Sequence, residues 1–288
     1  MSDKTALPYA EVIGDPISQS KSPLIHGFWL EKLGIEARYG SRRVTRASLV
    51  DYLEERGADP NWRGCNVTMP LKQTILPLLD RVDPQAFEIG AVNTVYREGD
   101  KLVGTNTDVA GFLEPLQGHL SQQHLFRMAR IIGTGGAARA IIAALRDHGF
   151  TLVVAGRNVS KAREVVNELA PSGEHYTAPL AQFAKPLHFD FDDRQGCLDL
   201  VVNASPLGMS GQPDLAFDIS HVPPGSVVYD IVTNPVETWL LQSAKGAGFE
   251  TIGGLSMLIG QAAVAFERFF GKAPPRNLDD ELITRIRA

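Results

Sequence analysis

Residues 130–142 read Arg-Ile-Ile-Gly-Thr-Gly-Gly-Ala-Ala-Arg-Ala-Ile-Ile and decide which fold we expect. The apolar run 128–132 predicts a buried strand, and the run 137–145, rich in Ala, Ile and Leu, predicts a helix. Gly133, Gly135 and Gly136 lie between them and are typical of a tight strand-to-helix turn. Because the first N–H groups of such a helix have no partner within the helix, this turn is suited to binding a phosphate.

The spacing G-x-G-G-A is a variant of the usual dinucleotide-binding fingerprint, and a turn that only connects two elements is the alternative. A second strand-like run, 151–155, follows about twenty residues after the fingerprint, where an Asp or Glu usually binds the ribose of a cofactor without a 2′-phosphate. Here the sequence continues as Gly156-Arg157-Asn158, with Lys161 shortly after. Two cations and no acid favour NADP(H), although Arg157 and Lys161 could also be solvated residues at the start of a helix.

Length, composition and charge are those of a globular protein. The chain has 288 residues, of which 44% are hydrophobic and 21% charged, so we expect about two domains. A net charge of −5 disfavours a nucleic-acid or anionic-membrane partner. Cys65 and Cys197 are far apart in sequence, so we expect neither a disulfide framework nor a metal site. With no signal-peptide pattern and no long apolar run, we expect a soluble, cytoplasmic protein.

The first third of the chain alternates strand and helix patterns. It predicts an α/β domain with a mostly parallel sheet, in which 92–97 and 101–106 form an antiparallel hairpin at the sheet edge. We expect strands at 9–13, 36–43 and 63–67, and helices at 24–33, at 48–56 with Ser48 as its cap, at 71–79 with an interruption at Pro77, and at 109–116.

The rest of the chain predicts a second α/β unit followed by two helices. We expect its strands at 128–132, 151–155, 198–203, 227–231 and 250–252. Residues 171–193 are poorly patterned and are interpreted as a long surface connection with at most one short strand. Helices at 255–270 and 277–287 are free to pack back on the first domain, which would make that domain discontinuous and leave a cleft between two lobes.

Polar residues follow the predicted strands of the first domain. They are hydroxyls, amides, one ammonium and one carboxylate, a set that suits a small polyol. Each also has a structural alternative, such as a helix cap for the serines and Asp108, a turn for the asparagines, or a solvated surface position for the lysine. The residues are Ser20, Ser22, Asn66, Thr68, Lys72, Asn93 and Asp108.

The order of motifs along nearly the whole chain resembles the shikimate dehydrogenase family. The motifs are VIGDPISQSKSP at 12–23, NVTMPLK at 66–72, GAVNT at 90–94, GTNTDVAG at 104–111, GTGGA at 133–137, NASPLGM at 203–209 and GGLSMLIGQA at 253–262.

The resemblance implies a cytoplasmic enzyme that reduces 3-dehydroshikimate to shikimate with NADP(H), reversibly, in chorismate and aromatic amino-acid biosynthesis. It implies a substrate-binding domain formed by residues 1–112 and 254–288, and a Rossmann-like NADP-binding domain formed by 113–253. The expected partners are small molecules only, with no nucleic acid and no membrane, and the expected state is a monomer or a homodimer.

The resemblance also assigns roles to single residues. Lys72 would be the acid/base and Asp108 would orient it. The substrate would be held by Ser20, Ser22, Thr68, Asn93, Asp108 and Gln261, with Thr233 nearby. The cofactor would be held at its pyrophosphate by Gly133, Thr134, Gly135, Gly136 and Ala137, at its 2′-phosphate by Gly156, Arg157, Asn158 and Lys161, and at its nicotinamide end by Ile231, Gly254 and Met257, with Asn203 and Ser205 close by.

Two departures from the family pattern leave alternatives open. Thr233 stands where the family commonly has a tyrosine, and Lys161 stands where it has an arginine, which would weaken the preference for NADP over NAD. Quinate dehydrogenase activity with NAD is therefore one alternative, although Ser22 favours shikimate because quinate-using relatives tend to have Thr there. A non-catalytic protein that senses NADP or shikimate is another, and it is disfavoured by the presence of both Lys72 and Asp108.

Overall fold

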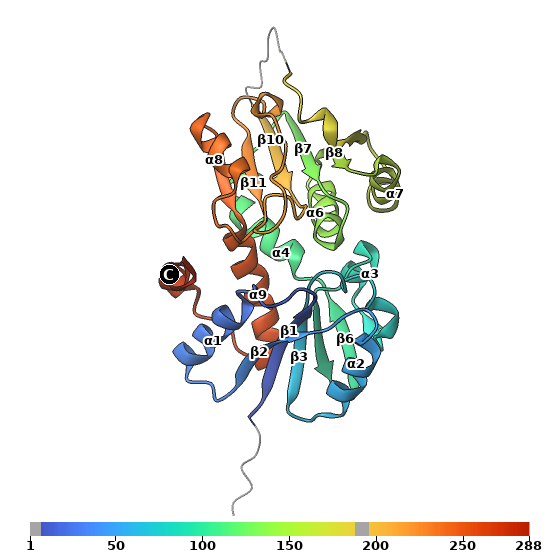
Figure 1. Ribbon diagram of the computed structural model, residues 1–288, viewed down its shortest axis with the longest axis vertical. Helices are drawn as coiled ribbons and strands as arrows, with labels where there is room; N and C mark the ends of the chain where they lie inside the picture. Colours follow the sequence, from blue (N-terminus) through green and yellow to red (C-terminus); the bar gives the residue numbers. More distant parts are fainter. Residues whose placement is uncertain (1–6, 188–195, 288) are drawn as a thin grey trace, which may run out of the picture. The chain divides into compact units, whose positions relative to one another are not determined.

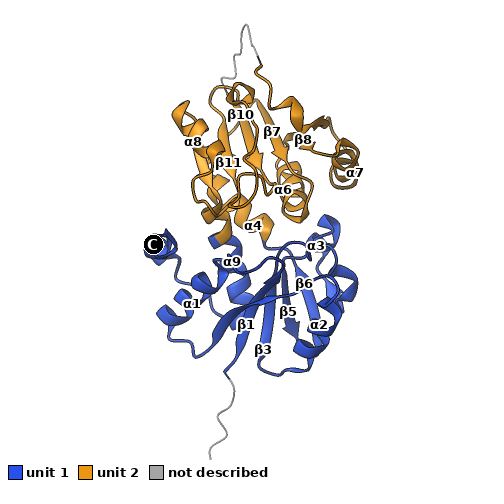
Figure 2. Ribbon diagram, in the orientation of Figure 1, with its two compact units in different colours: residues 1–107, 259–288 blue, residues 108–258 orange. Residues whose placement is uncertain are grey.

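The chain folds into two compact units, each built around its own sheet. The structure is a computed structural model that describes residues 7–187 and 196–287. Unit 1 takes its described residues from 1–107 and 259–288, and unit 2 consists of those in 108–258 (Figure 2). The division lies a few residues from the boundaries expected above, at 112/113 and 253/254. The α/β class expected from the sequence is confirmed.

Unit 1 contains a six-stranded sheet in the order β2-β1-β3-β5-β6-β4 (Figure 1). Strands β2, β1 and β3 are parallel, and β5 runs antiparallel to both β3 and β6. The predicted hairpin is confirmed as β5 and β6, but its place at the sheet edge was wrong. Asp80 and Leu102 exchange hydrogen bonds, and the short strand β4 that follows covers β6. The strands are β1 Tyr9–Gly14, β2 Arg38–Arg43, β3 Trp62–Val67, β4 Arg81–Val82, β5 Thr94–Glu98 and β6 Lys101–Thr105.

The helices of unit 1 agree with expectation except around Pro77 and at Pro84–Ile89, a short helix that was not predicted. Residues 71–79 form turns and a single 3-10 turn, so the helix predicted there was wrong. Pro77 lacks the N–H that a continued helix needs. Ser48 does precede a helix, but its hydroxyl bonds to Thr45 and caps no helical N–H. The helices are α1 Ser22–Leu33, α2 Leu49–Ala58, α3 Pro84–Ile89, α9 Gly254–Phe270, which begins in unit 2, and α10 Asp279–Arg287.

The two faces of the unit 1 sheet carry different cores. One face packs Ile13, Cys65 and Val95 against Leu49 and Tyr52 of α2. The other packs Ala10 against residues of α9, including Phe269. A Cβ on Gly64 would lie 2.6 Å from the Phe269 ring, so this glycine lets α9 approach the sheet closely. Two segments far apart in sequence therefore form a single unit.

Unit 2 contains a six-stranded parallel sheet in the order β12-β11-β10-β7-β8-β9 (Figure 1). The five strands predicted here are confirmed to within two residues at each end, and β9 lies in the poorly patterned stretch, whose residues 188–193 fall outside the described residues. The strands are β7 Phe126–Ile132, β8 Thr151–Gly156, β9 Tyr176–Pro179, β10 Cys197–Asn203, β11 Val227–Asp230 and β12 Glu250–Gly253, and the helices include α4 Asp108–Leu113, α6 Gly136–Asp147, α7 Val159–Leu169 and α8 Trp239–Gly246.

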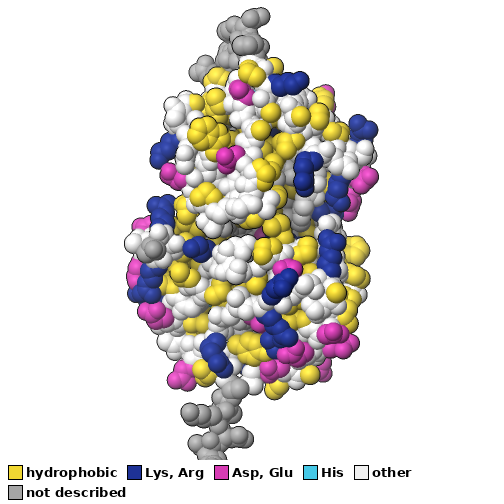
Figure 3. All heavy atoms as spheres, in the orientation of Figure 1, with side chains coloured by type: hydrophobic (Ala, Val, Ile, Leu, Met, Phe, Trp, Pro, Cys, Tyr) yellow, Lys and Arg dark blue, Asp and Glu magenta, His cyan; other side chains and the backbone are white. Residues whose placement is uncertain are grey.

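Charged side chains of both signs lie interspersed on the face of each unit that is seen in Figure 3. Among the described helices, none has the length and apolar character needed to cross a bilayer.

Candidate functional site

The glycine turn of unit 2 lies between β7 and α6, as the sequence predicts. Gly133 has a φ of +131°, and a Cβ there would lie 2.6 Å from the carbonyl oxygen of Ala204, so only glycine fits. Gly135 precedes α6 in an extended conformation and makes no side-chain cap, and a Cβ on it would meet no heavy atom within 4 Å. The first N–H groups of α6 therefore begin beside open space, which is the arrangement that binds a phosphate.

The cations predicted to select NADP lie in the next strand-to-helix turn and in the first turn of the helix that follows it. Gly156 ends β8, and the position of its absent Cβ is 3.3 Å from the Thr134 methyl group, so the two turns are neighbours. Arg157 and Lys161 are exposed. Asn158 caps α7, because its side-chain oxygen accepts the backbone N–H of Lys161 at 3.1 Å. Asn158 thus has a structural role at the start of α7, and the two exposed cations lie where both the cofactor role and the alternative of a solvated helix start place them.

An ion pair between a buried arginine and an exposed glutamate, not identified from the sequence, joins the two helices that follow these turns. Arg139 of α6 donates to both carboxylate oxygens of Glu168 on α7, at 2.9 and 2.5 Å. Arg139 is buried, and its guanidinium lowers the pKa of Glu168. The pair holds α7 against α6 and so keeps the Arg157 turn beside the glycine turn. Its partners are 29 residues apart, and nothing in the local pattern predicts the contact.

Asn203 and Ser205, expected close to the cofactor, form a turn of their own after β10. Asn203 Oδ1 accepts the Ser205 N–H at 3.1 Å and its hydroxyl at 2.8 Å, and Asn203 Nδ2 donates to Asp230 at 3.0 Å. Asp230 also accepts hydrogen bonds from the Val232 N–H and the Thr238 hydroxyl, although burial raises the pKa of its carboxyl group. Asp230, at the end of β11, thus organises the turns that carry several predicted site residues.

The residues expected at the nicotinamide end lie where α9 begins. A Cβ on Gly254 would be 2.4 Å from the carbonyl oxygens of both Ile231 and Val232, so the structure brings Ile231 and Gly254 into contact. Met257 is buried one turn further along α9, and Thr233 is partly exposed.

In unit 1, the loops after β1 and β3 pack directly on one another. A Cβ on Gly14 would lie 2.5 Å from the Thr68 side chain, and the Asp15 N–H donates to the Met69 carbonyl at 3.0 Å. Ser20 and Ser22 follow Asp15, and the Ser20 hydroxyl accepts the Ser22 N–H at 3.3 Å. That bond keeps Ser20 beside Ser22, the first residue of α1, but α1 has no side-chain cap, so the capping role that was the alternative for the serines is not observed.

Lys72 and Asn93 are connected through the backbone. The Val92 N–H donates to the Lys72 carbonyl at 2.8 Å, and the Val67 N–H donates to the Asn93 carbonyl at 2.7 Å. Lys72 is partly buried, whereas Asp108, the first residue of α4, is 4% exposed. Thr68, Lys72 and Asn93 therefore lie around the carboxyl end of β3.

The Asn93 side chain is buried among polar groups from two other segments. Its Oδ1 accepts the Thr107 N–H at 2.7 Å, and its Nδ2 donates to the Thr107 hydroxyl at 2.9 Å and to Gln261 Oε1 at 3.3 Å. The structure thus brings together Asn93 and Gln261, both predicted to bind substrate, and adds Thr107, to which the sequence assigned no role.

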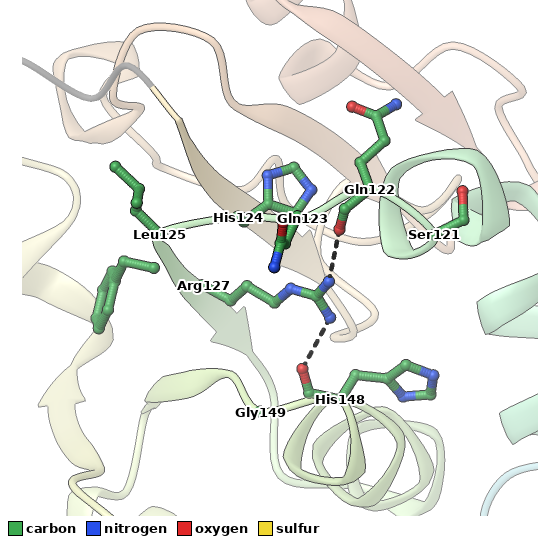
Figure 4. Close-up of a pocket in the computed structure, with 9 residues that line it drawn as sticks. Ser121, Gln122, Gln123, His124, Leu125, Arg127, His148 and Gly149 are labelled. Carbon is green, nitrogen blue, oxygen red and sulfur yellow. Dashed lines mark hydrogen bonds between the residues drawn. The ribbon is translucent and has the colours of Figure 1, made fainter.

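A separate hollow of about 600 Å³ opens on unit 2 and is lined by residues 121–127, His148 and Gly149 (Figure 4). No predicted site residue lines it. The Arg127 guanidinium donates to the carbonyl oxygens of Leu120, Gln122 and His148, so it fastens the loop before β7 to the end of α6.

Comparisons with known proteins match both units. Residues 12–95 match the shikimate dehydrogenase substrate binding domain, and residues 254–279 match the shikimate 5′-dehydrogenase C-terminal domain. A shikimate dehydrogenase (NADP(+)) from Sphingopyxis alaskensis is 46% identical over 284 residues, which cover 98% of each chain. The chain belongs to the shikimate dehydrogenase family.

Solved structures of the shikimate dehydrogenase family resemble the chain over almost its full length. Shikimate 5-dehydrogenase from Thermus thermophilus, in complex with NADP(H) and shikimate, is 33% identical with a TM-score of 0.78, covering 97% of this chain and 100% of that one. Quinate dehydrogenase from Corynebacterium glutamicum, in complex with NAD, is 32% identical with a TM-score of 0.81, covering 97% and 99%. The fold is common to enzymes with both substrates.

Proposed function

We propose that this chain catalyses the reversible, NADP-dependent reduction of 3-dehydroshikimate to shikimate, and so serves aromatic amino-acid biosynthesis. The observation that carries the proposal is the grouping of Thr68, Lys72 and Asn93 around the end of β3, fixed by the backbone bonds of Val67 and Val92. Hydroxyl, ammonium and amide groups together suit a polyol ketone that must be gripped and protonated. That grouping lies in the unit that matches the family's substrate-binding domain.

We assign the substrate's carboxylate and hydroxyls to polar groups of six segments. Buried amides and hydroxyls discriminate strongly between polyols, because a missing ligand hydroxyl leaves them unpaired. The assigned residues are Ser20, Ser22, Thr68, Asn93, Asp108, Thr233 and Gln261.

We assign NADP to unit 2, whose residues fit its charged groups. Gly133, Thr134, Gly135, Gly136 and Ala137 would hold the pyrophosphate, because Gly135 leaves space beside the start of α6. Gly156, Arg157, Asn158 and Lys161 would surround the 2′-phosphate, with the charge supplied by the exposed Arg157 and Lys161. Ile231, Gly254 and Met257 would lie at the nicotinamide end, supported by the turn of Asn203 and Ser205.

The proton for the reduction comes from Lys72 in this proposal. When bound, NADPH supplies the hydride to the ring carbonyl carbon, and negative charge then develops on the carbonyl oxygen. The Lys72 ammonium neutralises that charge by donating a proton, and takes it back in the reverse direction. Asp108, a buried carboxylate, would hold the ammonium and a neighbouring substrate hydroxyl in position.

Oxidation of quinate with NAD is the second candidate. It is favoured by Thr233, which is partly exposed and shorter than the tyrosine common in the family, and by Lys161, which lacks the bidentate fork of an arginine. Ser22 argues against it, because quinate-using relatives tend to have Thr at this position.

A spectrophotometric assay with four substrate and cofactor pairs tests both candidates. Shikimate and quinate are each supplied with NADP and with NAD, and the formation of reduced nicotinamide is followed. We expect the value of kcat/KM to be highest for shikimate with NADP, by about tenfold or more over the other pairs. A higher value for quinate with NAD would establish the second candidate, and binding of shikimate and NADP without turnover would identify a sensor.

We further propose that the enzyme works in the cytoplasm on small molecules alone, as a monomer or homodimer with no nucleic-acid or membrane partner. The net charge of −5 and the absence of a disulfide pair between Cys65 and Cys197 support this. Light scattering after size-exclusion chromatography distinguishes the two oligomeric states.

A further inference from the structure

A buried network of side-chain hydrogen bonds crosses unit 1 and ends at two residues of the proposed substrate site. The Tyr39 hydroxyl donates to Asn66 Oδ1 at 2.5 Å, and Asn66 Nδ2 donates to the Thr94 hydroxyl at 3.0 Å. The Thr94 hydroxyl donates to Asn93 Oδ1 at 3.1 Å, and Asn93 Nδ2 donates to Gln261 Oε1 at 3.3 Å. We call these five side chains the Tyr39–Gln261 network.

The strand register explains why the network can form. Asn66 and Thr94 are direct partners across β3 and β5. Tyr39 lies on β2, separated from β3 by β1, and its register partner on β1 is Ala10. Because Ala10 carries only a methyl group, the phenol can extend over β1 and reach Asn66. The imidazole of His26 stacks on the phenol with ring centroids 3.9 Å apart and planes 4° apart, which fixes its direction.

The bonds of the network all run in one direction. Each amide accepts at its oxygen and donates from its nitrogen to the next member, so the Tyr39 hydroxyl selects the orientation of the Asn66 amide. That orientation makes the Thr94 hydroxyl an acceptor from Asn66, which leaves its own proton for Asn93 Oδ1. The Thr107 N–H also donates to Asn93 Oδ1, at 2.7 Å, and with that oxygen held by two donors the Asn93 nitrogen is directed at Gln261. Asn66, Thr94, Asn93 and Gln261 are all at most 8% exposed, so water cannot readily replace a lost partner.

We propose that Tyr39 is a positioning residue for substrate binding, which acts through Asn66 and Thr94 to fix the amides of Asn93 and Gln261. This inference rests on the proposed function, because it takes Asn93 and Gln261 as groups that bind the substrate. Tyr39 belongs to no motif of the resemblance and lies on the edge strand β2, three positions along the sheet from β5.

The test compares Tyr39→Phe with Tyr52→Phe. Each removes one hydroxyl from a tyrosine in unit 1; Tyr52 donates to Glu11 at 2.9 Å and has no bond to the network. We expect Tyr39→Phe to raise the KM for shikimate about fivefold to tenfold, with kcat and the KM for NADP within about twofold of the parent. Tyr52→Phe should leave the KM for shikimate unchanged, even if it lowers the melting temperature as much as Tyr39→Phe does.

A double-mutant cycle with Thr94→Val makes the test specific to the network. Valine matches the shape of threonine and removes the hydroxyl between Asn66 and Asn93. Since both substitutions break the same series of bonds, we expect the double variant to have a KM close to that of the worse single variant. The inference would be overturned if the two single changes in KM multiplied in the double variant, or if Tyr39→Phe and Tyr52→Phe had the same KM for shikimate. Either result would leave the proposed function intact. A parent protein inactive on shikimate with NADP would overturn both proposals.

Discussion

Asn93 and Gln261 are joined by a hydrogen bond of 3.3 Å although 168 residues separate them in the sequence. Gln261 lies on α9, a helix that also packs Phe269 against Ala10 of strand β1. The same helix therefore completes the apolar core of unit 1 and supplies an amide to its polar site. Substitutions that shift α9 are expected to affect stability and substrate binding together.

Replacing Lys72 tests the proposed chemistry. We expect Lys72→Ala to lower kcat about a hundredfold or more, with little change in the dissociation constant for shikimate, because it removes a proton donor used in the transition state. Stopped-flow turnover and equilibrium binding measure the two effects. Lys101→Ala, at an exposed position on β6, serves as the control and should keep full activity. A Lys72→Ala enzyme with near-normal kcat would remove Lys72 from the mechanism.

The two ends of the glycine turn should respond differently to an added methyl group. Gly133→Ala introduces a Cβ at 2.6 Å from the Ala204 carbonyl oxygen at a φ of +131°, so we expect a loss of about 2 kcal/mol or more in unfolding free energy. Gly135→Ala meets no heavy atom within 4 Å, so stability should be nearly unchanged while the affinity for NADP falls about tenfold. Urea unfolding and NADP titration check the pair. If Gly133→Ala and Gly135→Ala changed the affinity for NADP equally and changed the unfolding free energy equally, the assigned phosphate site would be contradicted.

Removing the Arg157 guanidinium should lower the preference for NADP. We expect Arg157→Ala to raise the KM for NADP about tenfold or more and to leave the KM for NAD almost unchanged, because only NADP carries the 2′-phosphate. Arg163→Ala is a matched control, since it removes another exposed arginine, which lies within helix α7. If Arg163→Ala had the same effect, the preference would come from general charge and not from a contact with Arg157.

The buried His26 predicts that acid destabilises the protein. It packs among Trp29, Tyr39, Phe266 and Phe269, and neither ring nitrogen meets a hydrogen-bonding group among the described residues. Burial lowers the pKa of His26 to about 3, below the ordinary histidine value. The folded state therefore resists protonation, so this contribution to stability is complete above about pH 6.5 and is lost as the pH falls toward about 3.

The size of the His26 effect can be measured by unfolding in urea. Between about pH 7 and about pH 5 we expect His26 alone to account for a loss of about 2 kcal/mol in unfolding free energy. His26→Phe keeps a flat ring against Tyr39 and should remove this part of the pH dependence. His124→Asn, in the loop before β7, should keep it. Parallel pH profiles for the parent and His26→Phe would show that the imidazole takes up its proton in the folded state as readily as in the unfolded state.

The elements with local signals could be predicted from the sequence. Gly133, Gly135 and Gly136 mark the strand-to-helix turn within a few residues, and the structure has β7 and α6 on either side. The apolar runs of unit 2 predicted its parallel strands, because a strand that is buried on both faces is apolar along its length. By contrast, β4 contains only Arg81 and Val82, and it exists because Asp80 pairs with Leu102 from a later strand. Such a strand has no pattern of its own.

Parts of the candidate site depend on contacts that no local pattern encodes. The resemblance named Asn93 and Gln261 as substrate residues, but not the bond between them or their connection to Tyr39. Likewise, the resemblance named Asn158 as a cofactor residue, but not the cap that its side-chain oxygen forms on α7. The register of strands and the packing of helices decide these roles, and both are set by the whole unit.

The discontinuous build of unit 1 has a consequence for the order in which the chain can fold as it leaves the ribosome. All residues of unit 2 are translated before Ile259, so that unit has its complete sequence first. The face of β1 and β3 around Ala10 and Gly64 is covered only when Phe269 has been translated. Phe269 belongs to α9, which is close to the end of the chain. Until then, β1 and β3, which are translated early, have an uncovered apolar face, and we expect a chaperone to bind there.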